Sequence, residues 1–362
     1  MCPSPSQAKA ETITTPIDKE VTIRIGRGDF TRRVYLDNIG FLDGVSVVLP
    51  ILNEESYLRH AVTAILSQDF LGSMEIILAV GPSKDRTHSI AQELHARDAR
   101  IILVDNPSGR TAAGLNLAIN KSRYPIIVRV DGHAEIPKNY ISLAVQILHL
   151  TGAVNVGGMM AAQGVTSFER AVARAMRSPL GVGASRFHTG GAASSVDTVY
   201  LGVFIKSALV DVGGFDERFT RAQDWELNYR LRAAGGIVYF DPRLQVTYRP
   251  RATFKALAKQ YFEYGRWRRV VIRRHQGTVN VRYLAPPFAL LGTLISLILG
   301  FSISPICFGP AIIYLLFLIA AAIAIGRNLG ETFRLPAILF TMHMSWGAGF
   351  LTSTRTLAPS RD

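Results

Sequence analysis

Short apolar runs alternate with amphipathic stretches through residues 45–130. The apolar runs are rich in β-branched residues and too short for helices, so they predict strands, and the amphipathic stretches between them predict helices. Strands that alternate with helices of this length favour an α/β fold with a mostly parallel sheet, whose strand ends meet at one ligand-binding edge. The predicted strands are 45–50, 75–80, 100–104 and 126–130, and the predicted helices are 54–68, 86–97 and 111–121.

The pattern is less regular on either side of this region. Residues 178–195 are rich in Gly, Ala and Ser, which suits either a flexible lid or acceptor loop, or an ordinary surface connection. Alternating apolar and basic residues in 21–34 predict a hairpin or an edge strand. Residues 1–18 are polar and are expected to be mobile. The other predicted elements are helices 136–150, 168–177 and 224–234, and strands 199–205, 238–240 and 244–248.

The long apolar runs lie in the last eighty residues. Residues 284–301 and 303–325 are uncharged and long enough, at roughly 18 to 20 residues, to cross a bilayer. A third run, 335–352, contains polar and glycine positions that also suit a packed or re-entrant helix. Residues 255–274 are basic with interleaved aromatics, which suits nucleic acid or a membrane surface. Because the apolar runs follow, we interpret this stretch as juxtamembrane. Buried helices of a soluble core are the alternative.

Composition adds the expected organisation and location. The chain has 362 residues and a net charge of +13, and its two cysteines support neither a disulfide framework nor a cysteine metal site. The start lacks a signal-peptide pattern, and Lys and Arg are absent between positions 283 and 326, so the N-terminal domain is expected to be cytoplasmic on a multi-pass protein of the inner (plasma) membrane. The predicted parts are an extension (1–40), a catalytic domain (41–251), a juxtamembrane segment (252–282) and two or three transmembrane helices (283–354).

Candidate chemistry begins at the end of the strand 126–130. Asp131, Gly132 and His133 follow it directly, so the strand delivers an acid and an imidazole to the edge of the sheet. An acid at such a place can hold a cation. Asp-Gly is also a strong turn signal, and a simple turn is the alternative.

Five motifs in order resemble the family 2 glycosyltransferases, and within them the membrane-anchored enzymes of the succinoglycan-biosynthesis type. The resemblance covers residues 45 to about 275 and implies a GT-A fold and an inverting transfer. The motifs are VVLPILNEE at 47–55, SKDRT at 83–87, GRTAAGLN at 109–116, RVDGHA at 129–134, and GGFD at 213–216 with QDWEL at 223–227.

The resemblance also implies site residues. Asp224 matches the catalytic base, which removes the proton from the attacking acceptor hydroxyl, although it could instead cap the following helix. Asp131, with His133, matches the ligands of a divalent cation, Mn²⁺ or Mg²⁺, that neutralises the leaving diphosphate. Arg110, one of the residues expected to bind the donor, has the alternative of a solvent-exposed charge on a loop. The residues expected to bind the donor nucleotide are Pro50, Asn53, Glu54, Arg110 and Asn116, together with Asp131.

The chain departs from the family pattern at three positions. His133 stands where a second acid is usual, so either the metal preference shifts toward Mn²⁺ or His133 contacts the diphosphate. Val80 replaces an Asp that is available to uracil, which leaves the donor base less defined. Trp225 replaces another acid and is expected to stack on an acceptor sugar. Arg249 and Arg251 are expected to face a diphosphate, with surface charge as the alternative.

These residues predict an inverting hexosyltransferase of cell-envelope polysaccharide or glycolipid synthesis. The expected donor is a nucleotide diphosphate sugar, a UDP-sugar above all, and the expected acceptor is a polyprenyl- or other lipid-linked saccharide; nucleic acid is not an expected partner. The alternatives are direct transfer to polyprenyl phosphate and a non-catalytic membrane scaffold. A processive synthase is disfavoured because Gln260 and Arg266 are six residues apart, wider than that class's signature.

Overall fold

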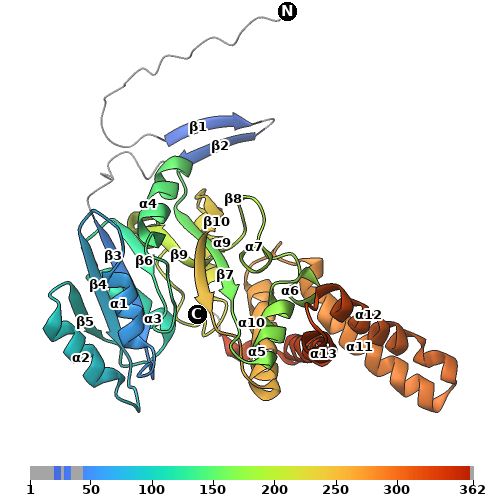
Figure 1. Ribbon diagram of the computed structural model, residues 1–362. Coiled ribbons are helices and arrows are strands. Elements are labelled where there is room, and N and C mark those ends of the chain that lie inside the picture. The colour runs from blue at the N-terminus through green and yellow to red at the C-terminus, as the bar shows by residue number, and fades with distance from the viewer. Residues whose placement is uncertain (1–19, 26–27, 34–43, 359–362) are drawn as a thin grey trace, which may run out of the picture.

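The computed structural model describes residues 20–25, 28–33 and 44–358. The expectation of a mobile segment at 1–18 lies outside these residues. β1 (Glu20–Ile25) and β2 (Gly28–Arg33) form an antiparallel pair above the main body, which confirms the predicted hairpin (Figure 1).

The main body is built on an eight-stranded sheet of order β5-β4-β3-β6-β9-β7-β10-β8. Most neighbours are parallel, and β9 runs antiparallel to both β6 and β7, as β8 does to β10. The predicted α/β fold with a mostly parallel sheet is therefore confirmed. The strands are β3 (Val45–Ile51), β4 (Met74–Val80), β5 (Ile101–Asp105), β6 (Ile126–Arg129), β7 (Asn155–Ala162), β8 (Ser194–Ser195), β9 (Tyr200–Ile205) and β10 (Val238–Tyr248).

Strand β7 was not predicted, because its Gly157 and Gly158 give a weak strand signal. Gly158 has a packing reason: a Cβ there would lie 1.7 Å from the carbonyl oxygen of Leu244, so only glycine lets β7 approach β10 so closely. The register between these strands shifts between Phe240 and Gln245. The two predicted closing strands are thus one irregular strand.

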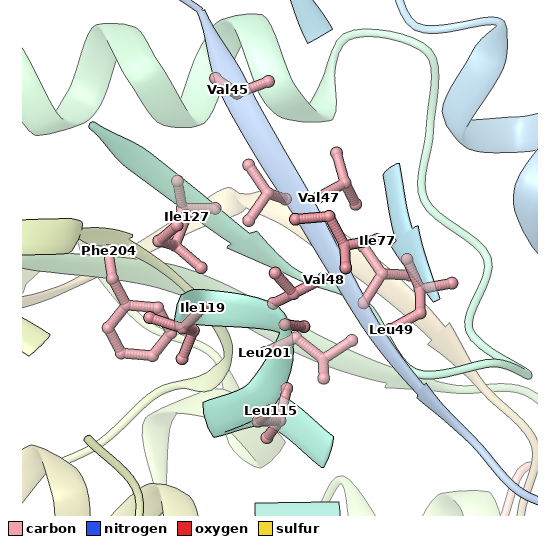
Figure 2. Packing of buried hydrophobic residues seen from close by; sticks show 14 of the residues in the cluster. Val45, Val47, Val48, Leu49, Ile77, Leu115, Ile119, Ile127, Leu201 and Phe204 are labelled. Carbon is pink, nitrogen blue, oxygen red and sulfur yellow. The ribbon is translucent and has the colours of Figure 1, made fainter. Parts of the chain in front are cut away.

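Helices cover both faces of the sheet (Figure 1). The apolar side chains of β3, such as Val48 and Leu49, pack among Leu115, Ile119 and Phe204 in a fully buried core (Figure 2). The predicted flexible stretch 178–195 contains two short helices and a short strand. The helices of this part are α1 (Leu58–Leu66), α2 (Thr87–Arg97), α3 (Thr111–Lys121), α4 (Tyr140–Thr151), α5 (Ser167–Met176), α6 (Pro179–Val182), α7 (Arg186–Thr189), α8 (Lys206–Asp211) and α9 (Gln223–Ala233).

The C-terminal part is helical and includes two helices long and apolar enough to cross a membrane, Val281–Ser302 and Pro305–Ile325. They form a hairpin that projects from the body, and most of their large apolar side chains are exposed (Figure 1). An exposed apolar surface of this size is typical of a membrane or protein contact. The elements are α10 (Phe254–Arg274), α11 (Val281–Ser302), η1 (Pro305–Phe308), α12 (Gly309–Ile325), α13 (Leu329–Thr352) and η2 (Arg355–Leu357).

Helix α13 contains the third apolar run and packs against α5, α10, α11 and α12. Its contact with α10 is close: a Cβ on Gly265 would lie 2.1 Å from the carbonyl oxygen of Trp346, and one on Gly349 would lie 2.0 Å from that of Phe262. Of the alternatives for this run, the structure therefore shows a packed helix.

The basic helix α10 is an internal support of the fold as well as a charged surface. Its apolar side, including Leu257 and Trp267, is buried. Arg269 donates to the carbonyl oxygens of Phe350 and Leu351 at 2.9 Å, and Arg273 donates to those of residues 353 and 354. The last carbonyls of a helix lack internal donors, so these arginines complete the end of α13. Two of the seven cations in the predicted juxtamembrane stretch are used in this way.

Candidate active site

A cavity of about 870 Å³ lies at the carboxyl ends of β3 and β6 and reaches the apolar helices α11, α12 and α13. Its sheet end is lined by Pro50 and Glu54 after β3, Asp131 and His133 after β6, and Asp224 in the first turn of α9. Strand ends and a helix start converge there, as in other open α/β folds. The two carboxylates expected to hold a cation and to act as base therefore line one cavity.

A buried arginine joins these carboxylates. Arg129 is the last residue of β6 and is 6% exposed. Its Nη1 donates to Oδ1 of Asp224, and its Nη2 donates to Oδ1 of Asp131 at 3.1 Å. The fork of one guanidinium thus fixes the relative positions of both acids, a geometry that a lysine would not reproduce.

The opposite charges of this group oppose the pKa shifts that burial alone would produce. Burial alone would lower the pKa of Arg129, but Asp224 and Asp131 outweigh it and the pKa is raised. Burial raises the pKa of the Asp224 carboxyl, while the charge of Arg129 opposes that rise. Asp224 is therefore a stronger base than a solvated aspartate, and the arginine favours its ionised form.

Sequence reasoning missed Arg129, although a signal was present. The strand Ile126–Arg129 is otherwise apolar, and an arginine is almost never fully buried unless it is paired. A charged residue in a central strand, two positions before an acid at the strand end, indicates such a pair.

His133 and Glu54 form a second contact at the sheet end. Nδ1 of His133 donates to Oε1 of Glu54 at 2.8 Å, and this hydrogen bond raises the pKa of the imidazole. A histidine that donates one ring nitrogen to a carboxylate is oriented to offer the other to a metal.

The described residues contain no group of three or more His, Cys, Asp or Glu side chains able to hold a metal ion alone. Mg²⁺ and Mn²⁺ at phosphate sites often use only one or two protein ligands and take the rest from the substrate and water. Asp131, with His133 oriented by Glu54, fits an ion of that kind.

Several predicted donor residues instead hold the loops around the cavity. Asn53, in the left-handed region at φ 57°, accepts from the backbone N–H of Lys84 at 2.8 Å and does not line the cavity. Asn116 exchanges two hydrogen bonds of 2.8 Å with the backbone of Phe215, which fixes the Gly-Gly turn before α9. Arg110 is exposed, and its neighbours Gly109 and Thr111, but not Arg110 itself, line the cavity.

The residues expected at the acceptor or diphosphate also differ in position. Trp225 lines the cavity but is 6% exposed, and its ring contacts Tyr229 and Arg268, so it presents no open face for stacking on a sugar. Arg249 forms an ion pair of 3.3 Å with Glu169 outside the cavity. Arg251 lines the cavity and is close enough to His133 to oppose the rise of its pKa.

A mostly parallel sheet with an acid after a central strand, and a second acid joined to it by Arg129 on the wall of the same cavity, is the arrangement of a GT-A type α/β fold. The fold is shared with a mannosyltransferase from Pyrobaculum calidifontis, solved in complex with GDP-Man and Mn²⁺ (TM-score 0.55, 18% identity, 85% of this chain and 86% of that chain). Residues 46–212, a little under half of the chain, match glycosyl transferase family 2, and this match together with the curated relatives supports a transferase.

Two curated relatives match most of the chain. It is 29% identical over 316 residues to the succinoglycan biosynthesis protein ExoA of Rhizobium meliloti, covering 84% of this chain and 93% of that protein. It is 23% identical over 319 residues to a dolichyl N-acetyl-α-D-glucosaminyl phosphate 3-β-D-2,3-diacetamido-2,3-dideoxy-β-D-glucuronosyltransferase of Methanococcus voltae, covering 84% and 95%. Both alignments extend well beyond the length of the region that matches family 2.

Proposed function

We propose that this protein is an inverting hexosyltransferase that moves a sugar from a nucleotide diphosphate donor, a UDP-sugar above all, to a lipid-linked saccharide. The observation that carries the proposal is that Asp131 and Asp224 line one cavity, joined by Arg129, and that this cavity continues to apolar helices. The names of the two long relatives, which concern succinoglycan synthesis and a dolichyl-phosphate-linked sugar, support the acceptor class.

In this proposal Asp224 is the general base. The acceptor hydroxyl must lose a proton as it attacks the donor sugar, and the base must lie on the side opposite the leaving diphosphate to give inversion. Burial raises the pKa of Asp224, which increases its affinity for that proton. The hydrogen bond from Arg129 holds the carboxylate in place during the transfer.

Asp131 and His133 would hold the divalent cation. When bound, such an ion neutralises the charge that develops on the leaving diphosphate. The carboxylate of Glu54 orients His133, and an imidazole ligand favours Mn²⁺ over Mg²⁺. Pro50 and Glu54 line the adjoining wall and Arg251 adds positive charge there, where the nucleotide and its diphosphate would lie.

The exposed apolar hairpin of α11 and α12 supports attachment to a membrane. Arg174 of α5 forms an ion pair of 3.5 Å with Glu331 at the start of α13, so the chain returns to the catalytic domain after the hairpin. Two crossings with both ends on one side agree with the Lys and Arg distribution. We propose a multi-pass protein of the inner membrane with a cytoplasmic catalytic domain.

The test is transfer from a panel of radiolabelled nucleotide sugars in isolated membranes, followed by lipid extraction. Wild type should form a labelled, lipid-soluble product that a chelator abolishes and Mn²⁺ restores. Asp131→Ala should lose both transfer and donor hydrolysis, and Asp224→Asn should lose transfer by a factor of about 10² to 10⁴. Asp98→Asn, whose side chain lies outside the cavity, is the matched control.

Two outcomes would contradict the proposal. Efficient labelling of added bare polyprenyl phosphate would favour the direct transferase, which needs no acceptor sugar. Absence of donor hydrolysis with every nucleotide sugar, in protein that is folded, would favour the non-catalytic scaffold.

A further inference from the structure

The cavity wall includes a half-buried arginine that has ring contacts but lacks hydrogen-bond acceptors for two of its nitrogens. Arg268 of α10 lies between two rings, 4.8 Å from the centroid of Trp225 and 4.3 Å from that of Tyr283. Its Nε and Nη1 are buried and have no hydrogen-bond partner among the described residues. Guanidinium nitrogens without acceptors are costly to bury, so the arrangement indicates an acceptor that the protein itself does not supply.

A second guanidinium increases the imbalance of charge. Arg282 contacts the same Tyr283 ring at 4.8 Å, and its buried Nε also has no partner in the described part of the chain. Asp197 pairs with Arg282 at 2.8 Å, and no carboxylate forms an ion pair with Arg268 within the described residues. Burial lowers the pKa of Arg268, and the charge of Arg282 lowers it further. Two cations facing one carboxylate favour a bound anion.

The position of this pair within the cavity indicates which substrate brings the anion. Trp225, on one side of Arg268, directly follows the proposed base Asp224. Tyr283, on the other side, lies in the first turn of the apolar helix α11. Beyond it the wall is formed by the three C-terminal helices and is mostly apolar, apart from the hydrogen-bonded pair Tyr314 and His343. The residues of this apolar arm are Ala285, Pro286, Ala289, Phe317, Met342 and Trp346.

We propose that Arg268 and Arg282 bind the phosphate of a lipid-linked acceptor, whose hydrocarbon chain occupies the apolar arm between α11, α12 and α13. The inference rests on the proposed function and specifies the acceptor part of that site. A lipid-linked sugar carries, in order, a hydroxyl, a sugar ring, a phosphate and a hydrocarbon chain. The cavity presents in the same order the base Asp224, the side chain of Trp225, the two arginines and the apolar arm. The donor diphosphate is assigned to the other end, near Asp131, His133 and Arg251.

Two further groups on the wall of the same cavity support a polar ligand. The indole Nε1 of Trp225 and the hydroxyl of Tyr261 are buried donors on the cavity wall without hydrogen-bond partners in the described ranges. Both side chains are less than a tenth exposed. An acceptor sugar and its phosphate would offer oxygens to them, which gives the edge of Trp225 a role in place of ring stacking.

The three tryptophans of the chain, Trp225, Trp267 and Trp346, all line this cavity, so intrinsic fluorescence reports on its occupancy. The full-length protein in phosphatidylcholine nanodiscs is titrated with geranylgeranyl diphosphate, inorganic pyrophosphate, geranylgeraniol and UDP. The variants are Arg268→Gln and Arg282→Gln. Lys259→Gln, an exposed cation on the same helix that does not line the cavity, is the matched control.

Geranylgeranyl diphosphate should bind the wild type more tightly than either pyrophosphate or geranylgeraniol. Arg268→Gln and Arg282→Gln should each weaken its binding by about tenfold to a hundredfold, the range expected for a hydrogen bond to a charged group. UDP binding should change by less than about twofold, and Lys259→Gln should resemble wild type. Because an unpaired buried charge is removed, Arg268→Gln should also melt no lower than wild type without ligand.

Each contrary result overturns the assignment. If the variants weakened the binding of UDP and of geranylgeranyl diphosphate equally, these arginines would bind the donor diphosphate. If geranylgeranyl diphosphate bound no more tightly than pyrophosphate, the apolar arm would not be the binding site of the hydrocarbon chain. If both variants bound the lipid as tightly as wild type, the arginines would not bind its phosphate. Since the assay involves no turnover, an active transferase with unaffected lipid binding would refute this inference and leave the proposed function intact.

Discussion

Replacement of Arg129 by methionine tests the central feature of the site, the single guanidinium shared by Asp131 and Asp224. Methionine has a similar length and fills the space but removes the charge and both hydrogen bonds. The two acids would then repel each other without a cation between them. Arg129→Lys keeps the charge and loses the fork, which makes it the matched control.

The expected size of the effect follows from the proximity of the charges. An arginine beside an aspartate lowers the carboxyl pKa by about 1 to 3 units, so its loss should raise the pKa of Asp224 by the same amount. Removal of one partner of a buried ion pair lowers the free energy of unfolding by about 3 to 5 kcal/mol. The folded-state pKa of Asp224 is already raised, so its contribution to stability is present at low pH and declines as the pH rises through that pKa.

Two measurements follow. The acid limb of the profile of kcat/KM against pH should move up by about 1 to 3 units in Arg129→Met and by less in Arg129→Lys. The deficit in melting temperature of Arg129→Met should be small near about pH 4 and grow toward neutrality. A folded Arg129→Met variant with an unmoved acid limb would refute the view that Asp224 is the base and that Arg129 controls its proton affinity.

Two further predictions concern the Glu54 contact and the helix packing. Glu54→Gln removes the hydrogen bond that raises the pKa of His133, so that pKa should fall toward its ordinary value of 6.5. Proton NMR titration measures it. An unchanged pKa of His133 would contradict the contact between Glu54 and His133. Gly265→Ala places a Cβ 2.1 Å from a backbone oxygen of α13 and should cost about 1 to 3 kcal/mol of the free energy of unfolding. Gly292→Ala, where nothing lies within 4 Å, should not destabilise the protein, and equal losses would argue against close packing of α10 on α13.

The sequence predicted those parts of the fold whose signal is local. The strand at 45–50 and the helix at 111–121 match β3 and α3 closely, because a short apolar run and an amphipathic stretch are signals carried by neighbouring residues. Strand β7 was missed because Gly158 is there to admit a neighbouring strand, a reason that exists only in the assembled sheet. The antiparallel insertion of β9 is likewise a property of topology, which periodicity does not contain.

The same division applies to the site. Asp131 and Asp224 were recognised from motifs and do line one cavity. Asn116 belongs to a motif as well, but its amide bonds the backbone of Phe215, ninety-nine positions away, a role that spacing cannot reveal. The rings that contact Arg268 belong to two other helices, so its lack of an acceptor emerges only once Trp225 and Tyr283 enclose it.

The close approach of α10 and α13 at Gly265 and Gly349 has a consequence for substrate choice. Helix α10 carries part of the wall of the catalytic cavity, and α13 packs on both α10 and the apolar hairpin, so close helix packing joins the two parts. In a bilayer, the height of Asp224 above the lipid phosphates would then be constant. Such an enzyme would extend only carriers whose terminal sugar lies at that height, and saccharide length itself would decide at which step of chain assembly it acts.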